Sequence, residues 1–191
     1  MQPRGLIAVG ALLAFLAVAG EGLASEQVWA LLKGGGQVIL MRHAITTPGV
    51  GDPPGMRLDD CSTQRNLTDE GRRHARRIGE AFRARGIVVD RVLASPWCRC
   101  LETARLAFGK AEVSQPLSNL FGRSENQEKQ VREMQALAGE RRSGGNLVLV
   151  SHGVTISALT GVALDTAEMV VVTPQGAGRF AVAGRLAAHL P

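Results

Sequence analysis

The stretch Gln37-Val38-Ile39-Leu40-Met41-Arg42-His43-Ala44 decides how the rest of the chain is interpreted. An apolar run of this length predicts a buried β-strand, and an Arg-His pair follows at its carboxyl end. A guanidinium matches phosphoryl oxygens with its planar fork of donors, and a neutral imidazole nitrogen can attack phosphorus. Alone, the pair is better explained as a basic residue and an ordinary histidine at a strand end. The pair indicates a phosphate site because an arginine or a histidine also follows two later predicted strands.

A second strand-to-helix turn carries an arginine. Residues 87–93 contain a short apolar strand, and Ser95 followed by Pro96 predicts the start of a helix over residues 96–108. Arg99 stands in the first turn of that helix. We therefore expect Arg99 at the same edge of a parallel sheet as the Arg-His pair.

A third turn carries a histidine. Residues 146–150 predict another buried strand, which is followed by Ser151-His152-Gly153 and then by an apolar helix over residues 154–160. Ligands of open parallel α/β sheets bind beyond the carboxyl ends of the strands. Four residues are therefore expected to meet in one pocket, namely Arg42, His43, Arg99 and His152.

The order of these segments predicts an α/β chain. Further helices are expected over residues 26–33 and over residues 68–85, the second with Thr68 as its N-cap. Two apolar segments near the end of the chain, residues 169–173 and 180–185, flank a glycine-rich stretch and predict a C-terminal hairpin. We expect one domain over residues 25–191, with a mostly parallel central sheet.

A loop of about twenty residues, 45–65, leaves directly from His43 and is rich in proline, glycine and aspartate. We expect it to form a wall or lid of the site. Of the three cysteines, Cys98 and Cys100 point in different directions on a helix, so the expected disulfide joins Cys61 to either of them. No Cys-x-x-Cys pair or closely spaced histidine pair suggests a zinc site.

Residues 1–24 have the pattern of a secretory signal, with Arg4, an apolar segment and small residues before a cleavage site expected after Ala24. The apolar run is shorter than the ~20 residues that span a bilayer, so we expect no transmembrane anchor in the mature chain. This pattern predicts a periplasmic or secreted protein. Three cysteines in an oxidising compartment are consistent with one disulfide and one free thiol.

The chain carries a formal net charge of +5, and removing residues 1–24 leaves that value unchanged because one arginine and one glutamate go together. Nucleic acid is not an expected partner, since aromatic residues that stack on bases are few. The charge suits a small anionic substrate or an anionic envelope surface, and it also suits a merely solvated face. Nothing in the sequence indicates the oligomeric state.

Four stretches carry a resemblance: Leu40-Met41-Arg42-His43-Ala44; Asn66-Leu67-Thr68-Asp69-Glu70-Gly71; Ser95-Pro96-Trp97-Cys98-Arg99 with Glu102-Thr103-Ala104; and Ser151-His152-Gly153. In this order they resemble the histidine phosphatase superfamily, also called phosphoglycerate mutase-like, over roughly residues 37–161. The resemblance implies a three-layer α/β/α sandwich and no metal or organic cofactor. It also implies that His43 is phosphorylated during turnover, with Arg42, Arg99, His152 and Gly153 binding the phosphate.

Two positions depart from the family pattern. Ala44 replaces the usual glycine after the histidine, which adds only a methyl group. Asn119 stands where many members have a glutamate that protonates the leaving group, and asparagine cannot act as an acid. Either the substrates have good leaving groups, or a nearby carboxyl takes over that role; the candidates are Glu125, Glu128, Asp59 and Asp60.

These features predict an exported phosphomonoesterase in which His43 attacks phosphorus and water then hydrolyses the phosphohistidine. A phosphohistidine protein phosphatase and a non-catalytic phosphate-binding protein are the alternatives, and a mutase is a weaker one. The expected partner is a small phosphorylated substrate, with envelope phosphates among the compatible classes. The residues do not select one substrate.

Overall fold

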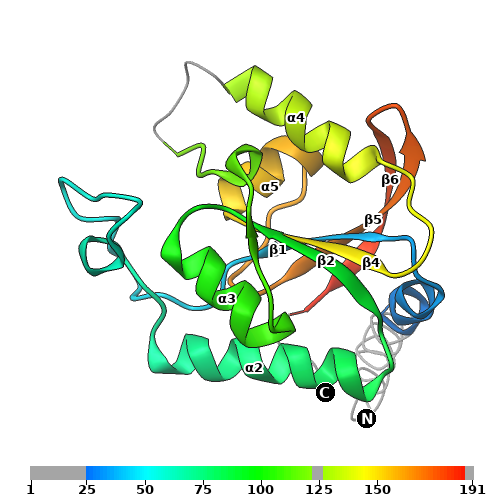
Figure 1. The fold of residues 1–191 in the computed structure, drawn as a ribbon, viewed down its shortest axis with the longest axis horizontal. Helices are drawn as coiled ribbons and strands as arrows, with labels where there is room; N and C mark the ends of the chain where they lie inside the picture. Colours follow the sequence, from blue (N-terminus) through cyan, green and yellow to red (C-terminus); the bar gives the residue numbers. More distant parts are fainter. Residues whose placement is uncertain (1–24, 122–126, 188–191) are drawn as a thin grey trace, which may run out of the picture.

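The computed structural model describes residues 25–121 and 127–187, which fold around a six-stranded sheet (Figure 1). The strand order is β3-β2-β4-β1-β5-β6. The bounds are β1 Val38–Arg42, β2 Val89–Ala94, β3 Glu112–Val113, β4 Asn146–Ser151, β5 Met169–Gly176 and β6 Arg179–Leu186. The first four strands are parallel, whereas β5 pairs antiparallel with β1 and forms a hairpin with β6. The predicted mostly parallel sheet with a C-terminal hairpin is confirmed.

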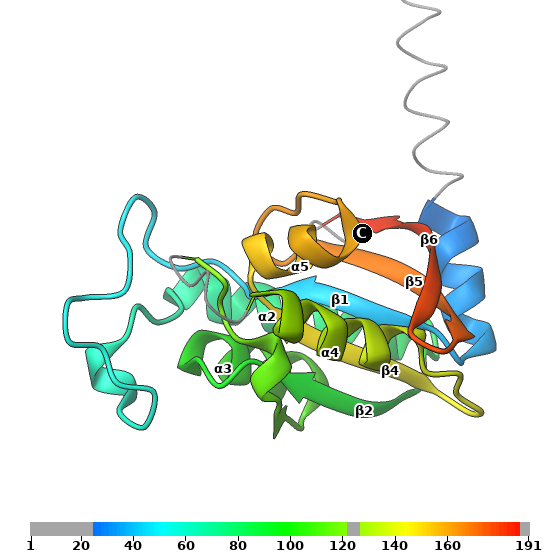
Figure 2. The same cartoon turned by 90° about the horizontal axis from the view of Figure 1, so that it is seen from above.

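Helices cover both faces of the sheet and complete three layers (Figures 1 and 2). The helix at residues 25–34, α2 (Asp69–Ala84) and α3 (Cys98–Phe108) lie on one face, and α4 (Gln127–Gly139) and α5 (Gly153–Thr160) lie on the other. Side chains of β1 alternate between two apolar clusters: Ile39 and Met41 belong to the first, Val38 and Leu40 to the second. Because β1 is buried on both faces, it is apolar at every position before Arg42.

The register of the sheet aligns the strand ends that matter for function. Arg42 at the end of β1 lies opposite Ser151 at the end of β4, and Ala94 at the end of β2 lies opposite Val150. The residues that follow these strands therefore leave the sheet at one edge. This alignment is the geometric basis of the site described below.

The start of α2 is fixed against the residues that follow His43. Thr68 caps the helix by accepting a hydrogen bond from the Gly71 amide at 3.0 Å, as the sequence predicts. The Thr68 amide in turn donates to the carbonyl oxygen of Ile45 at 3.0 Å. A Cβ on Gly71 would overlap that same carbonyl group, so glycine is what allows α2 to begin this close to the site.

The start of α3 differs from the prediction. The helix begins at Cys98 with Trp97 as its N-cap, not at Pro96 with Ser95 as the cap. The hydroxyl of Ser95 is engaged elsewhere, because it lies 2.8 Å from Nε2 of His152. A tertiary contact has replaced the local cap that the sequence suggests.

The sequence patterns above do not predict α4 or β3. The buried residues of α4 are Met134, Ala138 and Gly139, so its apolar stripe is too narrow to stand out in the sequence. The strand β3 is only two residues long and gains its definition from pairing with β2. Both α4 and β3 are therefore defined by tertiary contacts more than by a local sequence pattern.

The predicted signal segment, residues 1–24, lies outside the described residues, as does Glu125. Within the two described ranges, no helix is both long enough and apolar enough to cross a membrane.

Candidate active site

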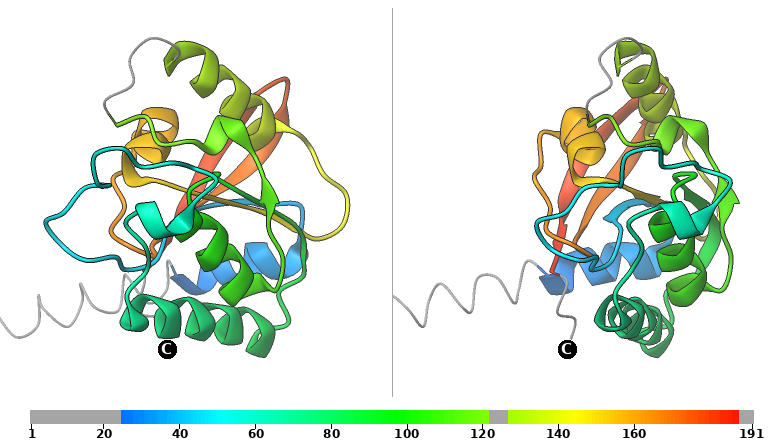
Figure 3. Two further views of the ribbon diagram at one scale, coloured as in Figure 1. Left: turned by 60° about the vertical axis from the view of Figure 1, so that its left-hand side comes forward. Right: turned by 90° about the vertical axis from the view of Figure 1, so that its left-hand side faces the viewer.

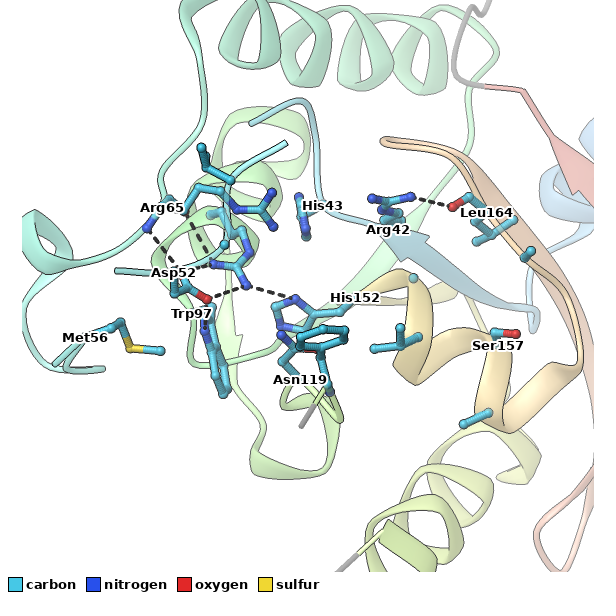
Figure 4. A pocket seen from close by; sticks show the side chains of 18 of the residues that line it. Arg42, His43, Asp52, Met56, Arg65, Trp97, Asn119, His152, Ser157 and Leu164 are labelled. Atoms are coloured by element: carbon cyan, nitrogen blue, oxygen red, sulfur yellow. Dashed lines mark hydrogen bonds and ion pairs between the residues drawn. The ribbon is translucent and has the colours of Figure 1, made fainter. Parts of the chain in front are cut away.

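A pocket of about 1030 Å³ opens at the carboxyl edge of the sheet (Figure 4). The loop between β1 and α2 spreads in front of this edge (Figure 3) and contributes Gly49, Val50, Gly51, Asp52 and Met56 to the lining. This loop is therefore a wall of the pocket, as predicted. The other lining residues are Arg42, His43, Arg65, Trp97, Arg99, Asn119, Phe121, His152, Gly153, Val154, Ser157, Ala158, Ala163 and Leu164.

The structure brings together Arg42, His43, Arg99 and His152, the four residues predicted to converge. They come from three different strand ends, and parallel pairing places these ends side by side. Gly153 also lines the pocket; a Cβ at this position would lie 3.4 Å from the side chain of Arg42, which leaves little room for any larger residue.

His43 is almost completely buried, with 2 % of its surface exposed. Its Nδ1 lies 2.8 Å from the carbonyl oxygen of Ala44, so Nδ1 carries the hydrogen and donates it. Burial lowers the pKa of His43 to about 3; the Ala44 hydrogen bond opposes that shift, and the charges of Arg99 and Arg42 add to it. The imidazole is therefore neutral near pH 7, with an unprotonated Nε2.

Three arginines surround this imidazole in the pocket lining: Arg42, Arg65 and Arg99. In each of them the Nε–H group is buried and has no hydrogen-bond partner among the described residues. Nη1 of Arg42 is held by the carbonyl oxygen of Leu164 at 2.8 Å. An anion between these side chains is the kind of ligand that would satisfy buried guanidinium donors. Sequence reasoning missed Arg65, although it directly precedes the Asn66-Leu67-Thr68 motif.

His152 is also buried and lies with its ring centroid 5.5 Å from that of His43. Its Nδ1 is 3.4 Å from Nη2 of Arg99, and a guanidinium can only donate, so Nδ1 accepts. The hydrogen is then on Nε2, which donates to the hydroxyl of Ser95 at 2.8 Å. Burial, followed by the charges of His43 and Arg99, lowers the pKa of His152 well below its ordinary value.

Asp52 is the main residue of the site that sequence reasoning missed. Its carboxylate pairs bidentately with Arg99, with Nη1 to Oδ1 at 2.7 Å and Nη2 to Oδ2 at 3.1 Å. It also accepts from the indole nitrogen of Trp97 at 3.2 Å and from the amide of Arg65 at 3.1 Å. Its position in the loop that leaves His43 was the available signal, but a loop aspartate is usually a turn residue.

The pKa of Asp52 reflects two opposing effects. Burial alone would raise it, but the hydrogen bond and positive charge of Arg99 outweigh burial and hold the pKa below its ordinary value. Asp52 is therefore an anion in the ligand-free site, and it neutralises part of the cationic charge there.

The same loop is fastened to α3 by a disulfide between Cys61 and Cys98, which resolves the two predicted pairings. Next to it, the amide of Cys98 donates to the side-chain oxygen of Gln64 at 2.9 Å. Cys100 remains a buried free thiol beside His152, and burial raises the pKa of this thiol to about 12. The thiol is thus protonated and unreactive near pH 7.

Three of the four proton donors proposed from the sequence, Asp59, Asp60 and Glu128, are not among the residues that line the pocket, and the fourth, Glu125, lies outside the described residues. Asp59 is exposed and pairs with Arg57, and Asp60 caps a short 3₁₀ helix through Ser62. Glu128 is exposed on α4 and pairs with Arg132. Their side chains are instead engaged in these local contacts, away from the pocket lining. Asn119 does line it, at the position where the family pattern has an acid.

The site does not have the composition of a metal centre. Three guanidinium groups repel a cation, and the described residues contain no group of three or more histidine, cysteine, aspartate or glutamate side chains placed to hold one.

Comparison with protein families gives a match to the histidine phosphatase superfamily (branch 1) over residues 38–121. This segment contains His43 and Arg99 together with the stretch between them that shapes the pocket. No curated protein matches the sequence significantly.

Several solved structures share the fold. The protein histidine phosphatase SixA, solved with tungstate, is 19% identical, and the match covers 80% of this chain and 97% of SixA with a TM-score of 0.59. Rv3214 from Mycobacterium tuberculosis is 21% identical over 80% and 98% of the two chains, with a TM-score of 0.60. The mycobacterial glucosyl-3-phosphoglycerate phosphatase Rv2419c is 16% identical over 76% and 96%, with a TM-score of 0.55.

Motifs, family match and fold agree, and they meet at one pocket with a neutral histidine among three arginines. The family match over residues 38–121 and the shared fold together support membership of the histidine phosphatase superfamily and a phosphatase activity.

Proposed function

We propose that the protein is an exported phosphomonoesterase that hydrolyses small phosphate esters through a phosphohistidine at His43. One observation carries the proposal: a buried, neutral imidazole faces a cluster of three guanidinium groups with unsatisfied donors. Such a cluster binds a phosphoryl group, and the neutral imidazole is the nucleophile that can accept it.

In the first step Nε2 of His43 attacks phosphorus in line while the bond to the leaving oxygen breaks. The hydrogen bond from Nδ1 to the Ala44 carbonyl orients the ring and stabilises the positive charge that develops on it. Arg42, Arg65 and Arg99 neutralise the non-bridging oxygens, and positioning of this kind dominates phosphoryl transfer. Water hydrolyses the phosphohistidine in the second step.

Export is supported by the signal pattern of residues 1–24 and by the Cys61–Cys98 disulfide, because disulfides persist mainly in oxidising compartments. An exported enzyme with a basic chain suits anionic substrates of the cell envelope or scavenged organic phosphates.

The test is hydrolysis of p-nitrophenyl phosphate together with chemical trapping of the intermediate from a radiolabelled substrate. We expect acid-labile, base-stable label on the peptide that contains His43, and no label in His43→Ala. In His152→Ala, labelling should slow without moving to another peptide. Label on the peptide of His152, or an acid-stable ester on Ser95 or Ser151, would contradict this mechanism.

A phosphohistidine side chain of a protein is the second candidate substrate, favoured by the likeness to a structure described as a protein histidine phosphatase. Comparing release of phosphate from a phosphohistidine peptide and from small esters separates the two. Faster turnover of the peptide, at equal concentration, would favour the second candidate.

A further inference from the structure

Asp52 holds a special position among the acidic residues. Of the described residues that line the pocket, it alone has a carboxyl group, and 17 % of its side chain is exposed. Four donors hold it there, two from the Arg99 guanidinium, one from Trp97 and one from the Arg65 amide. A carboxylate fixed in this way lines the same pocket as His43 and the three arginines.

Substrate must compete with Asp52 for Arg99. Both Nη atoms of Arg99 are engaged by the carboxylate, while its Nε–H has no partner among the described residues. A phosphoryl group that uses the full guanidinium fork therefore displaces at least one carboxylate oxygen. The carboxyl group is then next to a phosphoryl group, still held through Trp97 and the loop.

We propose that Asp52 is the proton donor and acceptor of the reaction, in the role that Asn119 cannot fill. The inference rests on the proposed function. In the first step the bond from His43 Nε2 to phosphorus forms, the bond to the leaving oxygen breaks, and protonated Asp52 gives its proton to that oxygen. In the second step Asp52, now a carboxylate, takes a proton from the water that attacks phosphorus, and the bond to Nε2 breaks. The cycle returns neutral His43 and protonated Asp52.

The charge state of Asp52 follows from the same geometry. In the ligand-free site Arg99 holds the carboxyl as an anion. A bound phosphoryl dianion takes over part of Arg99 and adds negative charge nearby, and both effects favour the protonated carboxyl. The proton is taken from solvent as substrate binds.

The test compares leaving groups in Asp52→Asn and the parent. An acid is needed to expel an alkoxide but not to expel p-nitrophenolate. We expect the pre-steady-state burst of p-nitrophenol from p-nitrophenyl phosphate to stay within a few-fold of the parent. Turnover of glycerol phosphate should fall by about 10²-fold or more. After the burst, phosphohistidine should accumulate in the variant because the water lacks its base.

Controls keep the outcomes distinct. Asp59→Asn, exposed on the same loop and outside the pocket, should match the parent on both substrates. Asp52→Glu should recover part of the glycerol phosphate activity, and inhibition by inorganic phosphate shows whether the binding site is intact.

Equal losses of activity of Asp52→Asn on both substrates would mean that Asp52 only positions Arg99, and a gain on both would mean that it only blocks Arg99. Either result overturns the inference. A parent without p-nitrophenyl phosphatase activity would instead refute the proposed function.

Discussion

Burial keeps the imidazole of His43 unprotonated. Only 2 % of its surface is exposed, and three arginines nearby make a positive charge on the ring unfavourable. His152 is subject to the same two effects. Both histidines are thus neutral near pH 7. Keeping them neutral lowers the free energy of unfolding at acidic pH, where a histidine in the unfolded chain takes up a proton.

This effect leads to a prediction about pH and stability. In the unfolded chain a histidine takes up a proton near pH 6.5, whereas in the folded chain His43 does so only near a pKa of about 3. Between these values the unfolded state binds more protons, so the free energy of unfolding should decrease as pH falls from about 6.5, by up to about 1.4 kcal/mol per pH unit for each histidine.

Denaturant unfolding across this pH window checks the prediction. As pH falls, the free energy of unfolding should decrease less steeply in His43→Gln and in His152→Gln than in the parent. Above about pH 7, the slope of this free energy against pH should be the same in all three proteins. Identical slopes below pH 6.5 would show that neither histidine is held neutral by the fold.

Arg99 is expected to be irreplaceable by lysine. Its fork engages two oxygens at once, and an ammonium group can reproduce the charge but not that geometry. Arg99→Lys should lower kcat/KM for p-nitrophenyl phosphate by about 10²- to 10³-fold. The matched control is Arg73→Lys, an exposed arginine of α2 that does not line the pocket. A similar small effect of both changes would argue against Arg99 as a phosphate ligand.

At the scale of elements, the loop between β1 and α2 and the first turn of α3 act as one unit. Two neighbouring residues of α3 hold this loop, since Cys98 forms the disulfide with Cys61 and Arg99 pairs with Asp52. Arg65 follows Cys61 by four residues in the same loop, and its amide donates to Asp52 at 3.1 Å. The disulfide therefore constrains the wall of the pocket.

Loss of the disulfide should lower both stability and activity. For the sequence separation of 37 residues, loop-closure entropy gives a stabilisation of about 3–4 kcal/mol. Reductant should decrease the free energy of unfolding of the parent and raise KM, because Asp52 and Arg65 lose their fixed positions. The double variant Cys61→Ser/Cys98→Ser should show both defects and no response to reductant. If reduction leaves the parent unchanged in both measurements, the disulfide has no part in shaping the site.

At the scale of the whole molecule, a three-layer sandwich brings together side chains more than a hundred positions apart, such as His43 and His152. Parallel pairing of β1 with β4 makes their carboxyl ends coincide, and the hairpin β5-β6 extends the sheet on the other side of β1. The position of His43 relative to His152 is thus set by strand pairing within the sheet.

For the whole chain we predict cleavage after Ala24 on export. Intact-mass analysis of periplasmic material should give the mass of residues 25–191 with one disulfide and one free thiol. Cytoplasmic material of a variant with charged residues in the apolar segment should keep residues 1–24. A retained N-terminus in periplasmic protein would contradict the prediction.

The sequence by itself determined the strand ends and the four residues that converge there. Apolar runs followed by Arg42-His43 and by His152 are local patterns, and the rule that parallel strands present their carboxyl ends at one edge converts such patterns into a site. The N-cap of α2 at Thr68 was predictable for the same reason, because capping involves residues that are neighbours in sequence.

Only the tertiary structure decided the places of Asp52 and Arg65, the pairing of Cys61 with Cys98, and the exclusion of Asp59, Asp60 and Glu128 from the pocket. The contact between Asp52 and Arg99 joins residues 47 positions apart, through a loop with no periodic pattern to fix its path. In the same way, the contact with His152 occupies Ser95, which local rules assign to the start of a helix. Periodicity fixes elements because it is repeated along the chain, whereas a single long-range contact depends on how the loops fold back, and that is set by the packing of the whole molecule.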